Sequence, residues 1–477
     1  MADSKILFPY ENHATRLNNY KHFERLFDGK HFDAFAVKIK SPLYAQQYAK
    51  LKYVSVNFAG LISRVCADML FGEGINIVVE NTNQQKWINN LVFENKLETQ
   101  FYESALINSR LGDDLFKVRS APQAGQMVNR VIVEEQRPDV YFPKLNKDSW
   151  RDEPEYQELG FVIKVNDNHY LRVERHYVGY YENHLYSLEG SDGNFRIGVD
   201  NPDVLQGALG LEPYVETGID RSLIIHVPNW RAGNYWGISD YADLETLMYA
   251  LNNRVTKNEN VLDKHTDPIL ALPEGVLDEK GKVKKESLEV FTIPDNELGG
   301  KPARPEYITW NASLDNSFKQ IEKLVEFLYM TSEISPATFG MDKDGQAESG
   351  RALKLKMMRT LAKINRKKRF YNQGIKEAMF VAQLLAQAHG FQVMGERMPG
   401  TPELVNIGWQ DGLPIDEIEQ VEVEGKRLES GLQTTKDALI RIDNITEEEA
   451  LAKAEEISKE QKVPVPAAAR TVVDGEE

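Results

Sequence analysis

The chain has 477 residues, of which 42% are hydrophobic and 27% charged, a composition typical of a soluble globular protein with about two to four domains. A formal net charge of −16 argues against general affinity for nucleic acid, because neutralising phosphates requires clustered Lys and Arg. The single cysteine, Cys66, excludes an intrachain disulfide and indicates a reducing compartment or indifference to redox conditions. No apolar run approaches the roughly 18 residues that span a bilayer, and the N-terminus lacks the apolar core of a signal peptide. We therefore expect no membrane association and assembly in the cytoplasm.

The N-terminal part of the chain predicts helices. In "VNFAGLISRVCADMLFGEG" apolar residues recur with a period near 3.6, and Gly72 follows as a stop signal. A second helix is predicted from about Glu94 to Leu111, with Leu97 and Phe101 on one stripe. Cys66 lies on the apolar face of the first helix, which favours a buried structural thiol over a nucleophile.

From Gly112 to about Val227 the pattern changes to short alternating segments. Glycine, asparagine, aspartate and proline punctuate them, as is typical of strands joined by turns. The sequence therefore predicts an antiparallel, half-exposed sheet without the strand–helix alternation of parallel folds. The segments are "DLFKVRS", "NRVIVEE", "DVYFPK", "LGFVIKVND", "HYLRVERHYVGYYE" and "SLIIHVPN".

A helical hairpin is predicted next. The stretch "GISDYADLETLMYALNNRVTKNENVLDK" predicts a helix of about 25 residues that begins at Ser239, a natural N-cap residue. A second helix is predicted from about Ala312 to Thr331. Between the two helices lies a β-rich insert with a lysine-rich turn, formed by Lys280, Lys282, Lys284 and Lys285.

A polar loop and a strongly basic helix follow the hairpin. The loop runs from Gly340 to Gly350, and the predicted helix continues to about His389, with Gly374 as a possible bend. Its first part has no acidic residue and carries nine basic ones: Arg351, Lys354, Lys356, Arg359, Lys363, Arg366, Lys367, Lys368 and Arg369. These cations can form a solvated face, pair with acids of a neighbouring segment, contact phosphates or dock a partner.

The C-terminal region predicts short helices. Gly431 is a stop signal, and Thr446 with Glu449 forms a capping box. The tail, residues 463–477, is rich in Pro and Ala and ends in charged residues, which predicts disorder.

Motifs for catalysis or metal binding are missing from the sequence. There is no GxxxxGK[ST] phosphate-binding loop, and the acids do not cluster as a catalytic pair. His169, His176 and His184 lie 7 and 8 residues apart in the predicted sheet, which is not a metal-ligand spacing. Asp342 and Asp344 lack the downstream Glu of a calcium loop. We therefore expect no cofactor, no metal and no enzymatic activity.

The order of these elements resembles the portal proteins of tailed bacteriophages, in particular the long-tailed siphophage type. Five stretches are similar to the family in the same order along the chain, whereas residues 120–225 match only in general character. The stretches are "VNFAGLISRVCADMLFGEG", "ESALINSRLGDDLFKV", "GISDYADLETLMYALNNRVTKNENVLDKHTDPIL", "TSEISPATFG…AESGRALKLKMM" and "LPIDEIEQVEVEGKRLESGLQTTKDALIRI".

The resemblance implies an α+β portal fold with a wing, a stem, a clip and a crown. Residues 1–238 would form the wing, with a helical part and then an antiparallel sheet. The later parts would be stem helix 239–263, clip 264–311, stem helix 312–332, tunnel loop and long wing helix 333–410, crown helices 411–462 and disordered tail 463–477.

The resemblance also implies a function and partners. Subunits of this family form a ring, usually of twelve, at one capsid vertex of the virion, and double-stranded DNA enters and leaves through its central tunnel. The ring docks the large subunit of the packaging terminase and later head–tail adaptor proteins, and it contacts the major capsid protein and a scaffold. Assembly would take place in the cytoplasm of the host bacterium.

Three sets of residues become candidate sites under this resemblance. The tunnel loop would contain Met341, Asp342, Lys343, Asp344, Gln346, Glu348 and Ser349. The basic helix, set against acids of the adjacent subunit, would contribute Arg351, Lys354, Lys356, Arg359, Lys363, Arg366 and Lys367. The clip lysines, Lys280, Lys282, Lys284 and Lys285, would form a docking surface.

Electrostatics agrees with a conduit that does not hold DNA. Each neutralised phosphate adds salt-dependent affinity, so a wall with excess negative charge lets a duplex slide. Two alternatives remain at this point: a DNA-processing enzyme such as a terminase nuclease, which needs a phosphate-binding loop or an acidic metal cluster, and a minor capsid or tail structural protein without a channel.

Overall fold

The computed structural model describes residues 7–36, 53–122, 129–165, 167–190, 195–266, 269–271, 306–308, 314–341, 350–410, 417–443, 445 and 447–461. Within them the chain forms two compact units. The larger unit contains residues 1–341 and 357–412, and the smaller contains residues 342–356 and 413–477.

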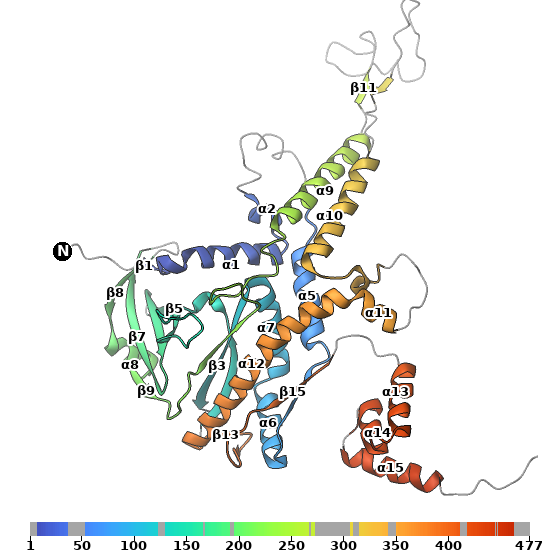
Figure 1. Ribbon diagram of the computed structural model, residues 1–477. Coiled ribbons are helices and arrows are strands. Elements are labelled where there is room, and N and C mark those ends of the chain that lie inside the picture. The colour runs from blue at the N-terminus through green and yellow to red at the C-terminus, as the bar shows by residue number, and fades with distance from the viewer. Residues whose placement is uncertain are drawn as a thin grey trace, which may run out of the picture. The chain divides into compact units, whose positions relative to one another are not determined.

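Helices form the N-terminal part of the larger unit (Figure 1). Both helices predicted there are confirmed, because α5 spans Phe58–Phe71 and α7 spans Leu97–Leu111. The Asn57 side chain caps α5 by accepting a hydrogen bond from the backbone of Gly60. Helix α6, Thr82–Glu94, lies in the region predicted to be helical, although the sequence analysis gives no bounds for it. The shorter or more peripheral helices are η1 (Glu11–His13), α1 (Ala14–Phe27) and α2 (His31–Ala34).

A five-stranded sheet lies beside these helices, in the order β10-β3-β4-β13-β14. Its neighbours are antiparallel except β13 and β4, which pair in parallel through Gln392 and Arg130. Strands β13 and β14 come from beyond the hairpin in sequence, so this sheet joins distant parts of the chain. The bounds are β3 Asp113–Pro122, β4 Asn129–Gln136, β10 Ile224–Pro228, β13 Gln392–Val393 and β14 Glu396–Arg397.

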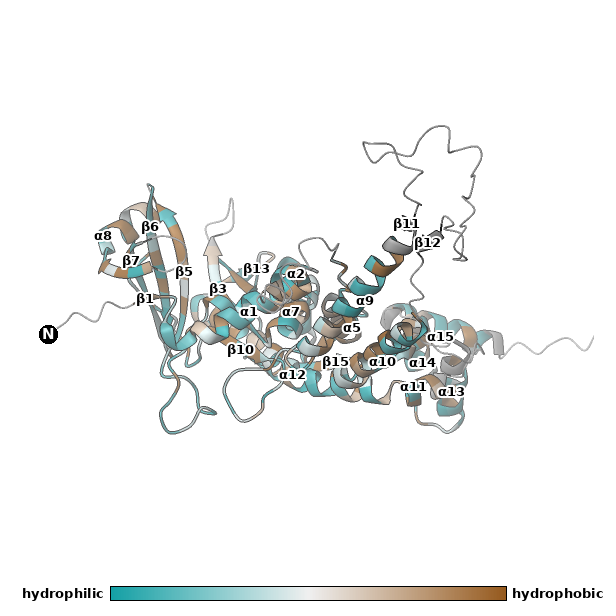
Figure 2. Cartoon of the chain, turned by 90° about the horizontal axis from the view of Figure 1, so that it is seen from above, coloured by the Kyte–Doolittle hydropathy of each residue, from teal (hydrophilic) through white to brown (hydrophobic). Residues whose placement is uncertain are grey.

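A second sheet has the order β1-β8-β7-β6-β5, with β9 also paired to β7. All its pairs are antiparallel, which confirms the prediction for this region. Hydrophilic and hydrophobic residues mix along its strands, as expected when one face is exposed (Figure 2). The bounds are β1 Leu7–Phe8, β5 Gln157–Val165, β6 Asn168–His176, β7 Tyr180–Glu189, β8 Phe195–Asp200 and β9 Tyr214–Glu216.

Two details of the sheet region differ from the sequence prediction. The segment 139–144 is not a strand, because Pro138–Val140 forms a 3-10 turn, η2, and only Tyr141 and Lys144 make isolated bridges to the neighbouring strand. A short helix, α8 (Pro202–Leu209), follows β8 and was not predicted.

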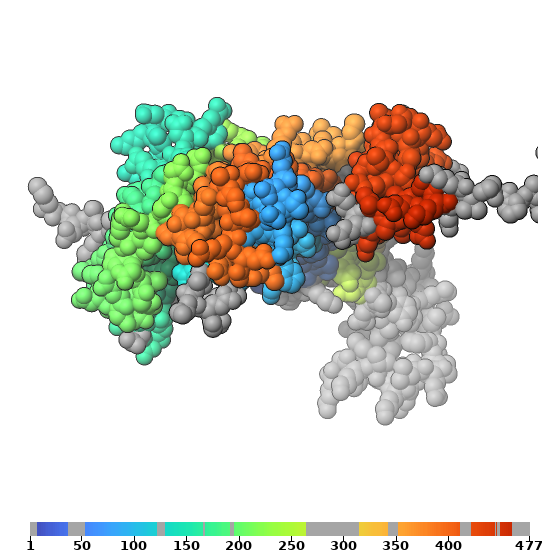
Figure 3. Space-filling model, turned by 90° about the horizontal axis from the view of Figure 1, so that it is seen from below, coloured from blue at the N-terminus to red at the C-terminus, as the bar shows by residue number. Residues whose placement is uncertain are grey.

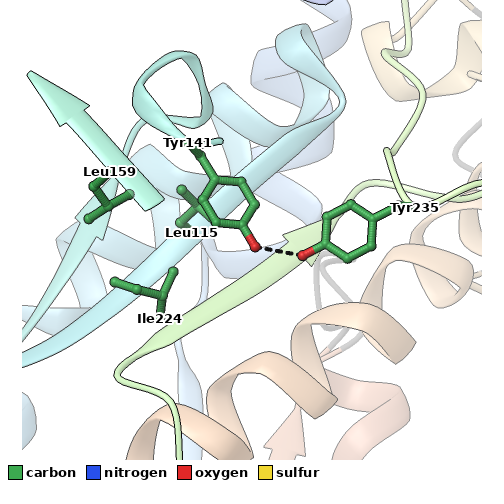
Figure 4. Close-up of a cluster of buried hydrophobic side chains, with 5 residues drawn as sticks. All are labelled: Leu115, Tyr141, Leu159, Ile224 and Tyr235. Atoms are coloured by element: carbon green, nitrogen blue, oxygen red, sulfur yellow. Dashed lines mark hydrogen bonds between the residues drawn. The ribbon is translucent and has the colours of Figure 1, made fainter. Parts of the chain in front are cut away.

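The two sheets share a hydrophobic cluster (Figure 4). Leu115 of the first sheet and Leu159 of the second are both fully buried, and Ile224 packs with them. Tyr141 and Tyr235 complete the cluster, and their hydroxyl oxygens lie 2.6 Å apart in a hydrogen bond. Because the buried hydroxyls satisfy each other, the cluster can include two tyrosines without an unpaired polar atom.

The predicted helical hairpin is present. Helices α9, Glu245–Thr266, and α10, Asp315–Ser332, run side by side, and Ser317 of α10 donates a 2.5 Å hydrogen bond to Asn258 of α9 (Figure 1). Helix α9 begins at Glu245 and not at Ser239, because Ser239 and Asp240 are held by the end of α7. Near the tip, β11 (Ile269–Ala271) pairs antiparallel with β12 (Glu306–Ile308).

The long basic helix is divided in two. Helix α11 spans Gly350–Lys356 in the smaller unit, and α12 spans Met358–His389 in the larger one, with a non-helical break at Met357. Helix α12 packs on strands β3, β4 and β10 and on α5. Its surface lies against that of the α5–α6 region, where Gln84 of α6 donates to Gln383 at 2.6 Å (Figure 3).

The remaining elements are short. Strands β2, Ile75–Val78, and β15, Asn406–Trp409, form a two-stranded antiparallel sheet in the larger unit, and η5 spans Pro336–Phe339. The smaller unit contains α13 (Glu417–Glu429), α14 (Thr435–Asp443) and α15 (Glu447–Gln461). Gly431 has a φ of 67° just after α13, which confirms it as a helix stop signal. Thr446 of the predicted capping box lies outside the described residues. No described helix is long and apolar enough to cross a membrane.

Gly374 serves close packing and does not bend α12, which continues through it. A Cβ at this position would lie 2.5 Å from Cγ2 of Val227, a fully buried side chain of β10. We expect Gly374→Ala to lower the free energy of unfolding by about 1–3 kcal/mol, although alanine favours helix more than glycine does. Denaturant unfolding measures the difference.

Gly207 of α8 provides the matched control, because its Cβ would meet nothing within 4 Å. Gly207→Ala is expected to leave stability unchanged or raise it. Val227→Ala combined with Gly374→Ala should cost less than the sum of the two single changes, since the smaller side chain makes room for the new methyl group. Additive losses would show that the close approach is not the cause.

Candidate functional site: the base of the helical hairpin

One face of α12 contacts the base of the hairpin, where the first hairpin helix begins and the second ends. Its residues recur at helical spacing, so their side chains point in one direction. Toward this face lie the segment that leads into α9 and the C-terminal end of α10. The three segments line an open pocket of about 470 Å³, which we call the hairpin-base pocket: Trp230, Ser239, Asp240, Asp243, Met330, Thr331, Ser332, Glu333, Arg359, Lys363, Arg366 and Lys367.

Asp240 occupies the buried end of this pocket. Its Oδ1 lies 3.1 Å from Nζ of Lys363, and its Oδ2 lies 2.6 Å from Nζ of Lys367. Its Oδ2 also accepts a 2.6 Å hydrogen bond from Ser109, and its Oδ1 accepts one of 3.2 Å from Asn229. The side chains of Asp240 and both lysines are less than a tenth exposed. The carboxylate therefore has a partner for each oxygen, as a buried charge requires.

The charges of this cluster support one another. Burial alone would raise the pKa of Asp240, but the ammonium groups of Lys363 and Lys367 outweigh it and hold that pKa below its usual range. Burial would likewise lower the pKa of Lys363, but the carboxylate of Asp240 raises it above its ordinary value. Both groups are thus charged at neutral pH.

Two glycines let the chain place Asp240 at this position. A Cβ on Gly237 would lie 1.9 Å from the carbonyl oxygen of Gly112, so these two backbones touch without side chains. Gly112 ends α7 with a φ of 93°, a conformation that glycine adopts without strain. The backbone of Asp240 then donates to the carbonyl of Ser109 at 2.9 Å. The segment 237–240 is thereby fixed against the end of α7.

The C-terminal end of α10 is held by the same face of α12. Lys363 donates a 2.9 Å hydrogen bond to the carbonyl of Ser332. Thr360 accepts from the backbone of Ser335 at 2.8 Å and donates to the carbonyl of Glu333 at 3.2 Å. These bonds satisfy carbonyls that a helix end leaves without intrahelical partners. Lys363 therefore connects both ends of the hairpin.

Glu333 follows α10 in an unusual backbone conformation. Its φ is 59° and its ψ is 24°, in the left-handed region that glycine usually occupies at a helix end. Its carboxylate pairs with two arginines of α12: Arg359 at 3.0 Å through one oxygen, and Arg366 through the other. Arg359 and Arg366 are 73% and 48% exposed, whereas Glu333 is 23% exposed, so the carboxylate lies between two solvent-facing guanidinium groups.

The predicted basic helix thus contains residues of different kinds. Lys363 and Lys367 are buried and pair with Asp240 of the same chain. Their contact with a neighbouring subunit stays a prediction. Arg359 and Arg366 are exposed but pair with Glu333. The other three lie on α11: Lys354 and Lys356, which are exposed, and Arg351, of which the structure describes the backbone only.

Of the other two sets of candidate residues, the structure describes only Met341. Met341 is 60% exposed, and its sulfur accepts a hydrogen bond from the Tyr329 hydroxyl at 3.2 Å. The rest of the predicted tunnel loop, Asp342, Lys343, Asp344, Gln346, Glu348 and Ser349, lies outside the described residues. So do the clip lysines Lys280, Lys282, Lys284 and Lys285.

Cys66 is buried, as predicted, and it lies next to the charged cluster. Its sulfur lies 3.6 Å from Oδ2 of Asp240, next to the two lysines. Burial raises the pKa of the Cys66 thiol, so it remains a neutral structural group. In the part of the chain that the structure describes, no group of three or more His, Cys, Asp or Glu is arranged to hold a metal ion.

The partnership of Asp240 with the lysines was missed by the sequence analysis. The sequence indicates that the lysines can pair with acids of a neighbouring segment, but it does not identify Asp240 as their partner. One signal was present: Lys363 and Lys367 are four residues apart and flank Ile364 of the apolar stripe, a position that requires a buried counter-charge.

The comparison with protein families identifies the class. The family model described as phage portal protein, SPP1 Gp6-like, matches residues 8–463. The chain belongs to this family and has the function of a phage portal protein. No curated protein sequence matches it.

Several solved structures contain similar chains. One is described as the neck of an empty gene transfer agent (GTA) particle computed with C6 symmetry: 11% identity, TM-score 0.43, 80% of this chain and 88% of that one covered. A second is the virion of the native gene transfer agent particle, with 11% identity, a TM-score of 0.43, and coverage of 81% of this chain and 89% of that one. A third is the neck of the native particle computed with C12 symmetry, with 12% identity, a TM-score of 0.41, and coverage of 80% of this chain and 89% of that one. The family assignment rests on the family model alone.

We expect Asp240→Asn to destabilise the chain strongly, by about 3–5 kcal/mol, because it leaves two buried ammonium groups without a counter-charge. The measurement is the free energy of unfolding at neutral pH.

The effect of this substitution should depend on pH. Because the folded-state pKa of Asp240 is depressed, the contribution of its carboxylate to stability is present above the unfolded pKa of about 3.9 and is lost as the pH falls below it. The difference between wild type and variant should therefore shrink as the pH falls below about 4.

Asp28→Asn is the control for this prediction. Asp28 pairs with Lys30 at 2.9 Å in an exposed ion pair, so its loss should change stability little. Equal effects of the two substitutions would contradict the central role of the buried cluster.

Proposed function

We propose that the protein forms a closed ring, of about twelve subunits, at one vertex of the capsid and acts as the conduit through which double-stranded DNA is packaged and ejected. The observation that carries the proposal is the match of one portal family model to residues 8–463, almost the whole chain. The protein acts in this role without catalysis and without a cofactor or metal.

The observed elements support a division of the chain into the parts of a portal. Helices α9 and α10 are assigned to the stem, which refines the predicted ranges 239–263 and 312–332. Residues 264–311 between them are assigned to the clip, residues 1–238 to the wing, and residues 333–410 to the tunnel loop and the long wing helix. The helices of residues 411–462 are assigned to the crown.

The surface of the hairpin supports assembly with further copies of the chain. Apolar side chains that would cost free energy in water remain on its outside: Leu262 of α9, and Phe318, Phe327 and Met330 of α10, are 42% to 74% exposed. In a ring of heterologous contacts, each hairpin would bury such residues against the next. Contacts of this kind are driven by the removal of apolar surface from water.

We assign docking roles to the clip lysines and to the basic residues of α11. The clip lysines, Lys280, Lys282, Lys284 and Lys285, would contact the terminase large subunit during packaging and a head–tail adaptor protein afterwards. The wing would contact the major capsid protein and, during assembly, a scaffold. Arg351, Lys354 and Lys356 would meet acids of the adjacent subunit. The tunnel loop 341–349, with both signs of charge, would touch passing DNA only weakly.

The two alternatives predict different observations. A terminase nuclease needs convergent acids that hold metal, and the described residues contain no such cluster. A capsid or tail protein without a channel would share the composition and differ in assembly.

Negative-stain images of the purified protein distinguish these functions. We expect closed rings of about twelve subunits with a central hole, and native mass spectrometry should give the same number. A monomer that cleaves DNA in the presence of a divalent cation would contradict the proposal, as would an oligomer without a hole.

Shortening of the loop 341–349 tests its role in the tunnel. We expect rings to form normally, because the folded elements on either side remain intact, while DNA packaging or retention is impaired. Replacement of 342–349 by glycine and serine at equal length separates the effect of chemistry from that of length. Normal packaging and retention with the shortened loop would contradict the assignment.

A further inference from the structure

The rim of the hairpin-base pocket contains two arginines whose charge is compensated by a single carboxylate. Arg359 and Arg366 are exposed, and both pair with Glu333. The pocket as a whole is lined by four cations and three acids, of which Asp240 is already held by the two buried lysines. Glu333 and the exposed Asp243 are the acids that remain for the arginines.

The backbone of Glu333 indicates that its side chain is required. A residue with a Cβ is strained at a φ of 59°, and glycine is the usual residue at this position of a helix end. The ion pairs are exposed on the arginine side, and exposed pairs contribute little to stability. Stability alone therefore gives little reason for a glutamate where glycine would be free of strain.

The geometry fits a different use of the carboxylate. A guanidinium group binds a phosphate through two parallel hydrogen bonds, the same geometry that it uses with a carboxylate. Each arginine pairs with Glu333 through one Nη2 atom, so the carboxylate competes with a phosphate for that donor. The pair of arginines could otherwise contact two phosphates of a duplex.

We infer that Glu333 is an intramolecular competitor for DNA phosphates, which keeps the affinity of Arg359 and Arg366 for DNA low. This inference rests on the proposed function as a DNA conduit. Arg359 and Arg366 lie 10 and 17 residues beyond Ser349, the last residue of the proposed tunnel loop, and the carboxylate of Glu333 lies between them. A conduit needs such a device because each phosphate contact adds salt-dependent affinity and slows a sliding duplex.

Binding of a short DNA duplex to the purified protein tests this inference. Fluorescence anisotropy at a series of salt concentrations gives the dissociation constant and its salt dependence. We expect Glu333→Gln to tighten binding about fivefold near 100 mM salt, as one newly available exposed charge pair would. The plot of log affinity against log salt should steepen by about 0.9 for each additional phosphate that the variant neutralises.

Matched variants separate this effect from a general change of charge. Glu326→Gln removes the same charge from the exposed Lys323–Glu326 pair of the same helix, α10, and should leave DNA binding unchanged. Arg359→Gln with Arg366→Gln, added to Glu333→Gln, should return the affinity to the wild-type value or below. Glu333→Gly also lacks the carboxylate but has no backbone strain, so it should bind DNA as tightly as Glu333→Gln and serves if the glutamine variant folds poorly.

Three results would overturn the inference: no increase in affinity for either Glu333 variant, an equal increase for Glu326→Gln, or an increase that persists without the two arginines. Each is measured on purified protein and does not depend on packaging. If rings form and package DNA while Glu333→Gln binds DNA no more tightly, the portal function stands and only this inference fails. If no ring forms, the proposed function fails whatever the DNA affinity.

Discussion

The buried ion pairs of Asp240 with Lys363 and Lys367 connect three parts of the chain that are far apart in sequence. Asp240 precedes the first hairpin helix, the lysines belong to α12, and Ser109 at the end of α7 donates to the same carboxylate. Lys363 extends the connection to the carbonyl of Ser332, where the second hairpin helix ends. A buried carboxylate between two ammonium groups is stable only with all partners in place, so the cluster fixes the hairpin base in one arrangement.

Glycines and small polar residues make this arrangement possible. The contact between Gly112 and Gly237 brings the segment before α9 onto the end of α7, and Gly374 lets α12 approach Val227 of the sheet. On the exposed side of the same face, α12 presents Arg359 and Arg366 to Glu333. One helix therefore combines a buried, structural set of cations with an exposed set that pairs with Glu333. The two sets occupy opposite sides of a single helical face, with lysines on the buried side and arginines on the exposed side.

The sequence allowed the prediction of elements whose pattern is local. The helices at Phe58–Phe71 and Asp315–Ser332 and the stop at Gly431 follow from periodicity and glycine chemistry within a few residues. The start of α9 could not be predicted in this way, because Ser239 has the side chain of an N-cap but is held by the carbonyl of Arg110. The same limit applies to the lysines of α12: their partner is 123 and 127 residues away, and a charge pattern along one helix does not identify it. Long-range pairing, and not propensity, decides which cations are buried.

The attachment of both hairpin helices to α12 has a mechanical consequence. A force applied at the tip of the hairpin would pass down both helices and reach the same short stretch of one helix, around Lys363. The two helices would share the load there, since Asp240 stands before one and Ser332 ends the other. Under such a load the relevant quantity is the rate at which the ion pairs break and not their equilibrium stability, because forced unfolding is governed by the unfolding rate. A buried cluster that must lose several contacts at once would resist such a load.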